Sequence, residues 1–214
     1  MLALFVALSL TAADAEVAEP ETPPRSWDVP LSARLGLVLP GEISPYGVLL
    51  TKSGPAPIFL LEGGIEWKWF SVQAELQLAP LSGPPTLFDE NRGTSSYTVF
   101  SLGVTPSFRW PVADWVVLRI GPTFGLNAIF GSATFTGTDV CRGESSCKVD
   151  STGFGINFAP NLQAAFRLSG HWWLNAQASF FSQLLGFAST SDGHNRAYGI
   201  APIVFFAVGP EYRL

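Results

Sequence analysis

The sequence predicts an all-β protein: a transmembrane, antiparallel, up-and-down β-barrel of about eight strands. Hydrophobic residues make up 47% of the 214 residues and charged residues only 14%, whereas soluble globular domains carry roughly 25% charged residues. The sequence nevertheless has no run of about 18 apolar residues after position 15, as a membrane-spanning helix would need. Its apolar residues instead alternate with polar or small ones. A barrel whose outer face meets lipid exposes apolar side chains in that alternation.

Residues 1–28 are predicted to lie outside the barrel. Residues 1–15 are predicted to be a secretion signal, because Leu2 to Leu10 is almost uniformly apolar and the small residues Ala13 and Ala15 precede a cleavage point. A short buried helix is the alternative for this segment. Residues 16–28 are rich in Pro and Glu without periodicity, so they are expected to form a disordered periplasmic tail. The barrel is then expected to span residues 29–214.

An alternation with a period of two residues identifies the strands. It is clearest at 71–78 and returns at 118–127 and 154–167. A helix of 3.6 residues per turn would scatter each apolar set around its cylinder, and the Gly and Pro residues inside these segments also disfavour a helix. Counting such segments predicts eight strands, at residues 29–39, 58–67, 71–79, 97–110, 115–130, 153–168, 172–184 and 198–214.

The predicted connections alternate in length. Three are short, at 68–70, 111–114 and 169–171, and four are long, at 40–57, 80–96, 131–152 and 185–197. Tight periplasmic turns and long external loops are typical of bacterial outer-membrane barrels. In this layout the sequence resembles the OmpA/OmpX-type family of small eight-stranded outer-membrane barrels over residues 29–214.

The resemblance implies a location and a set of partners. The expected location is the outer membrane of a Gram-negative bacterium, with the long loops extracellular. An even number of strands then places both termini on the periplasmic side. The implied partners are outer-membrane lipids, lipopolysaccharide and the barrel-insertion machinery. The net charge of −5 and the lack of a Lys/Arg cluster exclude nucleic acid as a partner.

The tryptophans separate a membrane barrel from a soluble barrel such as a lipocalin, whose apolar face points inward. Six of the seven flank the short turns. In a membrane barrel they share one rim, where amphipathic rings favour the interface between lipid and water. The sequence therefore predicts an aromatic girdle formed by Trp67, Trp69, Trp110, Trp115, Trp172 and Trp173.

The inward faces of the predicted strands carry charges of both signs. An eight-stranded barrel is filled by its own side chains, and an unpaired buried charge is strongly destabilising. We therefore predict a salt-bridge network that closes the lumen at mid-depth, with Glu62 and Glu211 as the neighbours of Arg34. Its members are Arg34, Glu62, Glu75, Arg119 and Glu211. Four further charges are expected in solvent at the rim: Glu66, Arg109, Arg167 and Arg213.

The two cysteines, Cys141 and Cys147, are separated by five residues in a polar stretch. In an exported protein this spacing predicts a local disulfide. No His or third Cys stands nearby, so no metal site is predicted, and no motif in the sequence indicates a cofactor. Asp89, Glu90 and Asn91 could hold a divalent cation between lipopolysaccharide phosphates, but a solvated acidic loop is the commoner arrangement.

Three functions remain open on the sequence alone. The favoured one is a non-enzymatic structural or surface-interaction barrel with a closed lumen. The second is a narrow channel or small-ligand carrier, in which small inward residues open a cavity: Gly103, Gly121, Gly125 and Gly155. The third is a lipid A-modifying enzyme that uses Ser189 or Ser191 with Asp192 and His194. Residues of these types are also common in any exposed loop.

Overall fold

The computed structural model describes residues 27–39, 41–45, 50–83, 85–87, 90–91, 93–137, 141, 143–190, 195–200 and 203–214. The predicted signal at 1–15 and the tail up to residue 26 lie outside these ranges. So do four residues of the candidate cation and catalytic sites, namely Asp89, Ser191, Asp192 and His194.

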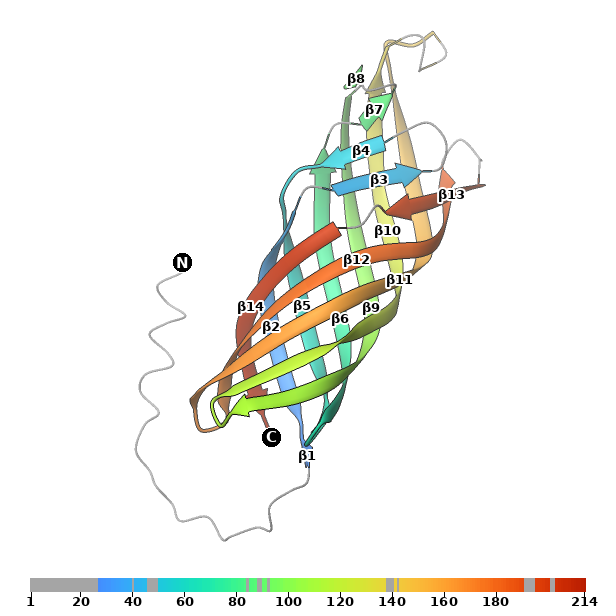
Figure 1. Cartoon of the computed structure of the whole chain (residues 1–214). Coiled ribbons are helices and arrows are strands. Elements are labelled where there is room, and N and C mark those ends of the chain that lie inside the picture. The colour runs from blue at the N-terminus through green and yellow to red at the C-terminus, as the bar shows by residue number, and fades with distance from the viewer. Residues whose placement is uncertain are drawn as a thin grey trace.

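Eight antiparallel strands close into a barrel (Figure 1), with neighbours in chain order and the last strand paired to the first. They are β2 (Pro30–Val38), β5 (Ala56–Trp67), β6 (Phe70–Gly83), β9 (Gly93–Ala113), β10 (Val116–Thr136), β11 (Ser146–Ser169), β12 (Trp172–Thr190) and β14 (Ile203–Arg213). The prediction of an eight-stranded up-and-down barrel is confirmed. Within the described ranges, no helix is long and apolar enough to cross a membrane.

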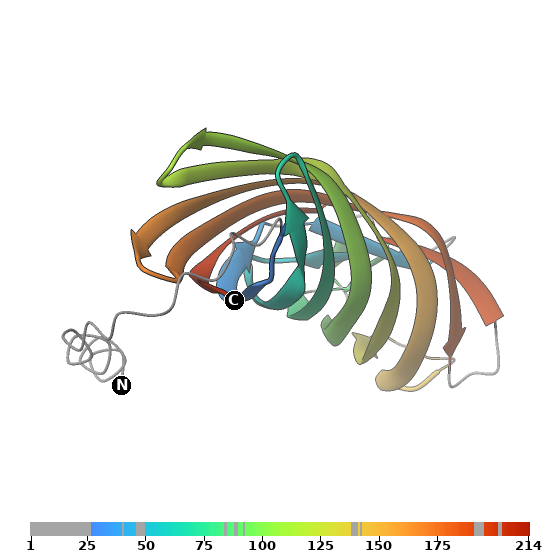
Figure 2. The same ribbon diagram turned by 90° about the horizontal axis from the view of Figure 1, so that it is seen from below.

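The short connections all lie at one end of the barrel, which we call the short-turn end; the opposite end is the long-loop end (Figure 1). Figure 2 views the molecule from the short-turn end. Here β1 (Trp27–Asp28) pairs with β5, with Trp27 opposite Trp67. The predicted disordered tail, 16–28, is therefore wrong for its last two residues, because they continue the pairing of β2 along β5.

Four neighbouring strands are much longer than the others. Strands β9, β10, β11 and β12 contain 21, 21, 24 and 19 residues, whereas β2 and β14 contain 9 and 11. Much of the predicted loop at 131–152 is therefore strand, since the β10–β11 ladder continues to Thr136 opposite Ser146. This extension buries Ala133 and Phe135 against Cys141.

A second set of short strands lies at the long-loop end (Figure 1). They are β3 (Gly41–Pro45), β4 (Leu50–Ser53), β7 (Pro85–Leu87), β8 (Glu90–Asn91) and β13 (Asn195–Ile200). The single predicted strand at 198–214 is therefore wrong. It is divided because β13 pairs with β3 and the upper part of β12, whereas β14 pairs with β2 and the lower part of β12.

The barrel carries its apolar side chains on the outside. Along β6, Ser71, Gln73 and Glu75 are buried, whereas the alternating Leu78 is exposed. On β10 the outward Leu126 has 65% of its surface exposed. Large apolar residues are exposed in this way on all eight barrel strands. This arrangement confirms the lipid-facing outer surface and is opposite to the lipocalin alternative.

Inside the barrel, the side chains change from polar to apolar toward the long-loop end. On β6 the inward series continues past Gln77 to the buried Ala79 and Leu81. These residues belong to a packed apolar cluster, which comprises Val38, Ala56, Ile58, Leu60, Ala79, Leu81, Tyr97, Val99, Ile129, Ala159, Phe205 and Ala207. The lower lumen is thus polar, and the upper lumen combines this apolar cluster with buried polar residues such as Ser101, Asn127 and Asn157.

Gly209 marks a close approach of β14 to β2. A Cβ atom at this position would lie 2.0 Å from the carbonyl oxygen of Ala33 and 2.8 Å from the Cα of Arg34. We expect Gly209→Val to lose most of the heat-modifiable folded form on refolding from urea into detergent, because the opposing backbone cannot retreat. Gly54→Val is the control, since nothing lies within 4 Å of that position. Equal refolding of the two variants would contradict this expectation.

Candidate functional site

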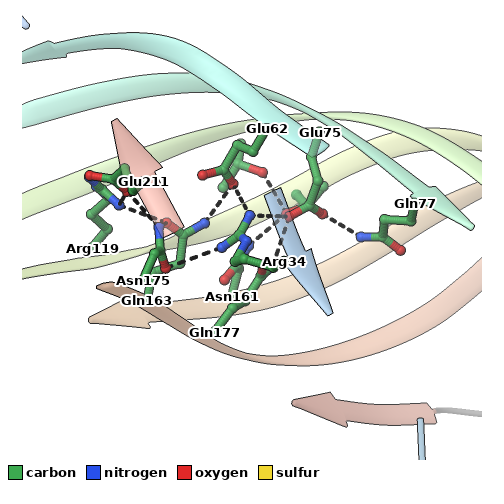
Figure 3. Close-up of polar contacts among 12 residues, drawn as sticks. Arg34, Glu62, Glu75, Gln77, Arg119, Asn161, Gln163, Asn175, Gln177 and Glu211 are labelled. Atoms are coloured by element: carbon green, nitrogen blue, oxygen red, sulfur yellow. Dashed lines mark hydrogen bonds and ion pairs between the residues drawn. The ribbon is translucent and has the colours of Figure 1, made fainter. Parts of the chain in front are cut away.

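The lower lumen contains a dense network of charged and amide side chains. Arg34 is on β2, Glu62 on β5, Glu75 on β6, Arg119 on β10 and Glu211 on β14. All five side chains are buried. They point inward because each occupies the polar phase of its strand's alternation. The structure places them in two groups around two arginines (Figure 3).

Arg34 is the centre of the first group. Its Nη2 lies 2.8 Å from Oε2 of Glu62 and 3.3 Å from Oε2 of Glu75. The two glutamates stand directly opposite each other on β5 and β6, so a single guanidinium lies against both. Gln177 donates to Glu75 at 2.9 Å, and Gln77 also donates to Glu75.

Arg119 is the centre of the second group. It donates to both carboxylate oxygens of Glu211, from Nη1 at 2.9 Å and from Nη2 at 2.8 Å. Its Nε donates to Glu66. Paired parallel bonds between guanidinium and carboxylate fix orientation as well as distance. Arg213 completes the group, with its Nε 2.8 Å from Glu211 and its Nη1 3.4 Å from Glu66.

Two amide side chains join these groups into one network (Figure 3). Gln163 donates to Glu62 at 2.7 Å and accepts from Arg119 at 3.1 Å. Asn175 donates to Glu211 at 2.6 Å and accepts from Arg34 at 3.3 Å. The network therefore extends across the lumen without a break, from β2, β5 and β6 to β10, β11, β12 and β14.

Several expected positions are corrected by the structure. Glu211 is not a neighbour of Arg34; it pairs with Arg119 instead. Glu66 and Arg213, expected in solvent at the rim, are 1% and 6% exposed, because they complete the Arg119 group. Arg109 is half-buried, with Nε 3.0 Å from Glu66, and Arg167 is exposed.

The network is electrically balanced. It contains four arginines and four glutamates, namely Arg34, Arg109, Arg119, Arg213, Glu62, Glu66, Glu75 and Glu211. Balance matters because each buried charge that lacked a partner would be strongly destabilising. Four amide side chains of the network were not predicted from the sequence: Gln77, Asn175, Gln163 and Gln177. Two of them could have been found, because Gln77 and Gln163 occupy polar, inward positions in the alternating segments at 71–78 and 154–167.

Comparisons with known proteins place this geometry in context. No profile of a known family matches the sequence, and no curated protein matches it. Solved structures do match. The outer membrane protein OprG from Pseudomonas aeruginosa superposes with a TM-score of 0.63 over 89% of this chain and 97% of its own, at 12% identity. The chain has the fold of the small outer-membrane β-barrels.

Two further solved outer-membrane proteins share this fold. Neisserial surface protein A matches with a TM-score of 0.51 at 10% identity, over 89% of this chain and 97% of its own. A major outer membrane protein from Thermus thermophilus matches with a TM-score of 0.50 at 10% identity, over 89% of this chain and 100% of its own. Identities this low show a shared fold and no shared activity.

The tryptophans gather at the short-turn end of the barrel, where five of them are exposed: Trp67, Trp69, Trp110, Trp115 and Trp172. Trp173 is different. It was expected in the girdle, but it is 7% exposed and faces the lumen, where the guanidinium of Arg213 stacks 3.8 Å from its ring centre. Successive residues of a strand face opposite sides, so Trp172 and Trp173 could not both face lipid. Trp27 adds another exposed ring at this end.

Cys141 and Cys147 form a disulfide at the tip of the β10–β11 hairpin, with Cα atoms 5.4 Å apart. It lies at the long-loop end, away from the charged network. Among the described side chains, no group of three or more His, Cys, Asp or Glu is arranged to hold a metal ion.

Three of the four inward glycines of the channel alternative do not open a cavity as that alternative required. A Cβ at Gly103 would lie 2.7 Å from Cγ2 of Thr123, and one at Gly125 would lie 2.5 Å from the carbonyl oxygen of Leu102. At Gly121 the carbonyl oxygen of Pro106 is 2.1 Å away. These glycines allow neighbouring strands to approach closely, so they contribute packing rather than space.

Proposed function

We propose that the protein is a non-enzymatic outer-membrane barrel with a closed lumen, whose long-loop end presents an interaction surface. The observation that carries this proposal is the unbroken network from Arg34 to Arg213 across the lower lumen. A pore of this size would need a continuous polar path. Here the lower part is occupied by paired side chains, and above it the lumen is filled by the apolar cluster around Leu60 and Phe205 together with buried Asn127 and Asn157.

The proposed orientation places the short-turn end in the periplasm and the long-loop end outside the cell. The tryptophan girdle at the short-turn end supports a membrane interface there. Lipopolysaccharide then surrounds the other rim. A maleimide dye that cannot cross membranes tests this orientation. In intact cells it should label Glu144→Cys near the hairpin tip but not Asp114→Cys in the β9–β10 turn; the reverse pattern would contradict the orientation.

The long-loop end is suited to binding because paired strands extend there beyond the rest of the barrel and hold its surface in place. The hairpin of β10 and β11 carries its disulfide tip on a continuous ladder. The short strands β13, β3, β4, β7 and β8 continue the same sheet beyond β12 at this end. A binding surface built on rigid strands loses less conformational entropy on binding than a free loop does.

Electrical recording tests the closed lumen directly. We expect the unmodified protein in a planar bilayer to show no stable unitary conductance, since the charges of the network are paired with one another and not available to a passing ion. Arg34→Ala should produce brief openings, because it leaves Glu62 and Glu75 facing each other without their shared cation. Lys148→Ala is the control, because Lys148 is exposed at the long-loop end and pairs there with the exposed Asp150. A large, steady conductance in the unmodified protein would overturn the proposal.

A further inference from the structure

A cavity of about 580 Å³ opens at the short-turn end, below the charged network. It is lined by residues from six strands and two turns, including Arg109 of β9, Arg167 of β11 and Arg213 of β14. Three arginines from separate strands therefore converge on one hollow. The closed lumen does not require this convergence, since Arg167 forms no part of the network.

These arginines have donor groups left over after their bonds within the protein are counted. Nη2 of Arg213 is buried and has no hydrogen-bond partner among the described residues. Arg109 uses Nε on Glu66 and Nη1 on the carbonyl oxygen of Lys68, at 3.2 Å. Within the described part of the chain, Arg167 donates only from Nε, at 3.3 Å to the carbonyl oxygen of Gly170. A buried guanidinium nitrogen without an acceptor is costly, so an acceptor entering the cavity is favoured.

The cavity is also preorganised. Arg213 is held by Glu211 from Nε and by the ring of Trp173, which fixes the plane of its guanidinium. The ring of His171 is tied by Nδ1 to the carbonyl oxygen of Arg213, at 2.8 Å. Donors that are already in place lose little freedom when a ligand binds.

The chemistry of the lining indicates the ligand. Guanidinium groups match the planar pairs of oxygens on phosphates and carboxylates. The two acids of the lining, Asp28 and Asp114, form no ion pair with these arginines among the described residues. Apolar atoms of Pro111, Val117 and Trp173 complete the wall, so the hollow can also hold a small organic group.

We propose that this cavity is a binding site for a small phosphate monoester, with Arg109, Arg167 and Arg213 as its donors. The phosphate could belong to a soluble molecule or to a lipid whose headgroup is itself a phosphate monoester, as in phosphatidic acid. Both sources present the same three oxygens to the arginines.

The test uses the full-length barrel in an uncharged detergent, with glycerol 3-phosphate as the probe and calorimetry as the measurement. We expect saturable binding that Arg167→Gln weakens about tenfold or more, the effect of losing a charged hydrogen bond. Arg167 is exposed at the end of its strand, so this variant should fold, as heat-modifiable migration will show. Lys148→Gln, at the opposite end, should bind like the unmodified protein.

The outcomes separate the site from its alternatives. No binding by the unmodified protein, equal binding by Arg167→Gln, or equal binding of glycerol would each overturn the proposal. Repeating the titration in nanodiscs that contain phosphatidic acid identifies the source. Unchanged affinity there supports a soluble phosphate, and a loss of affinity supports a headgroup already in the cavity.

Discussion

Arg119→Ala should destabilise the barrel by about 3–5 kcal/mol, the cost of leaving buried charges without their partner. Arg119 is 1% exposed and contacts Glu66, Glu211 and Gln163. Removing it leaves two glutamates whose remaining cations, among the described residues, lie at the short-turn end, at Arg109 and Arg213. Urea unfolding in lipid vesicles, followed by tryptophan fluorescence, measures the change in the free energy of unfolding.

Arg167→Ala is the matched control for this measurement. Both residues are arginines on the β10–β11 pair of strands, but Arg167 is exposed and its hydrogen bond goes to a backbone carbonyl. Its removal should change the free energy of unfolding by no more than about 0.5 kcal/mol, as is usual for a surface substitution. An Arg119→Ala barrel as stable as the control would show that the network fills the lumen without stabilising it.

Leu102→Arg should cost about 2–4 kcal/mol in a lipid bilayer, as expected for a basic side chain near the membrane midplane. Leu102 lies in the middle of β9, is 54% exposed on the outer face, and stands between Leu76 and Leu126 of the neighbouring strands. The cost arises because the guanidinium replaces an apolar contact with acyl chains. Folding into vesicles of saturated phosphatidylcholine measures it.

Leu168→Arg separates this effect from a general intolerance of arginine. Leu168 is 65% exposed, but it is the second-last residue of β11, beside the Gly170–His171 turn. There an arginine reaches the headgroups, so the expected cost is about 0–1 kcal/mol. Equal costs for the two variants would mean that the outer face does not meet lipid in the manner described.

The sequence predicted strands well where the two faces of a strand differ in chemistry. The prediction at 71–79 locates the core of β6 because Ser71, Gln73 and Glu75 alternate with apolar residues. In the upper lumen this contrast is lost, since Ile58, Phe59, Leu60 and Leu61 are apolar on both faces. The start of β5 was therefore placed two residues late, and the apolar cluster was not anticipated.

The long strands were missed for the opposite reason. At Ser95 and Ser96 both faces of β9 are polar. Near the end of β10 the apolar residues Ala133 and Phe135 are buried on the inner face, and the residues that alternate with them are polar. Beyond the lipid there is no apolar requirement on the outside, so the outward apolar pattern ends while the hydrogen-bonded ladder continues. The alternation of side chains in the sequence cannot show where backbone hydrogen bonding between strands continues.

Which charged residues pair with each other depends on the three-dimensional geometry of the barrel, and the spacing of residues along the sequence does not show that geometry. Arg34 was expected beside Glu211 because both lie on adjacent strands, but Glu211 stands opposite Ser32. Arg119 instead reaches across the lumen to strands β5 and β14, which are not its neighbours in the sheet. Which inward side chains meet across a closed barrel depends on tilt and register, and neither can be determined from one sequence.

The height of β11 has a practical consequence for engineering. A strand needs only about 9–11 residues to cross a bilayer, whereas β11 has 24. Its residues at the long-loop end therefore extend beyond the hydrocarbon, and the disulfide lies at the tip of this extension. A foreign peptide spliced between the exposed Gly143 and Glu144 would sit above that disulfide. The hairpin is thus a suitable site for displaying vaccine epitopes, because a peptide inserted there contacts none of the side chains that close the lumen.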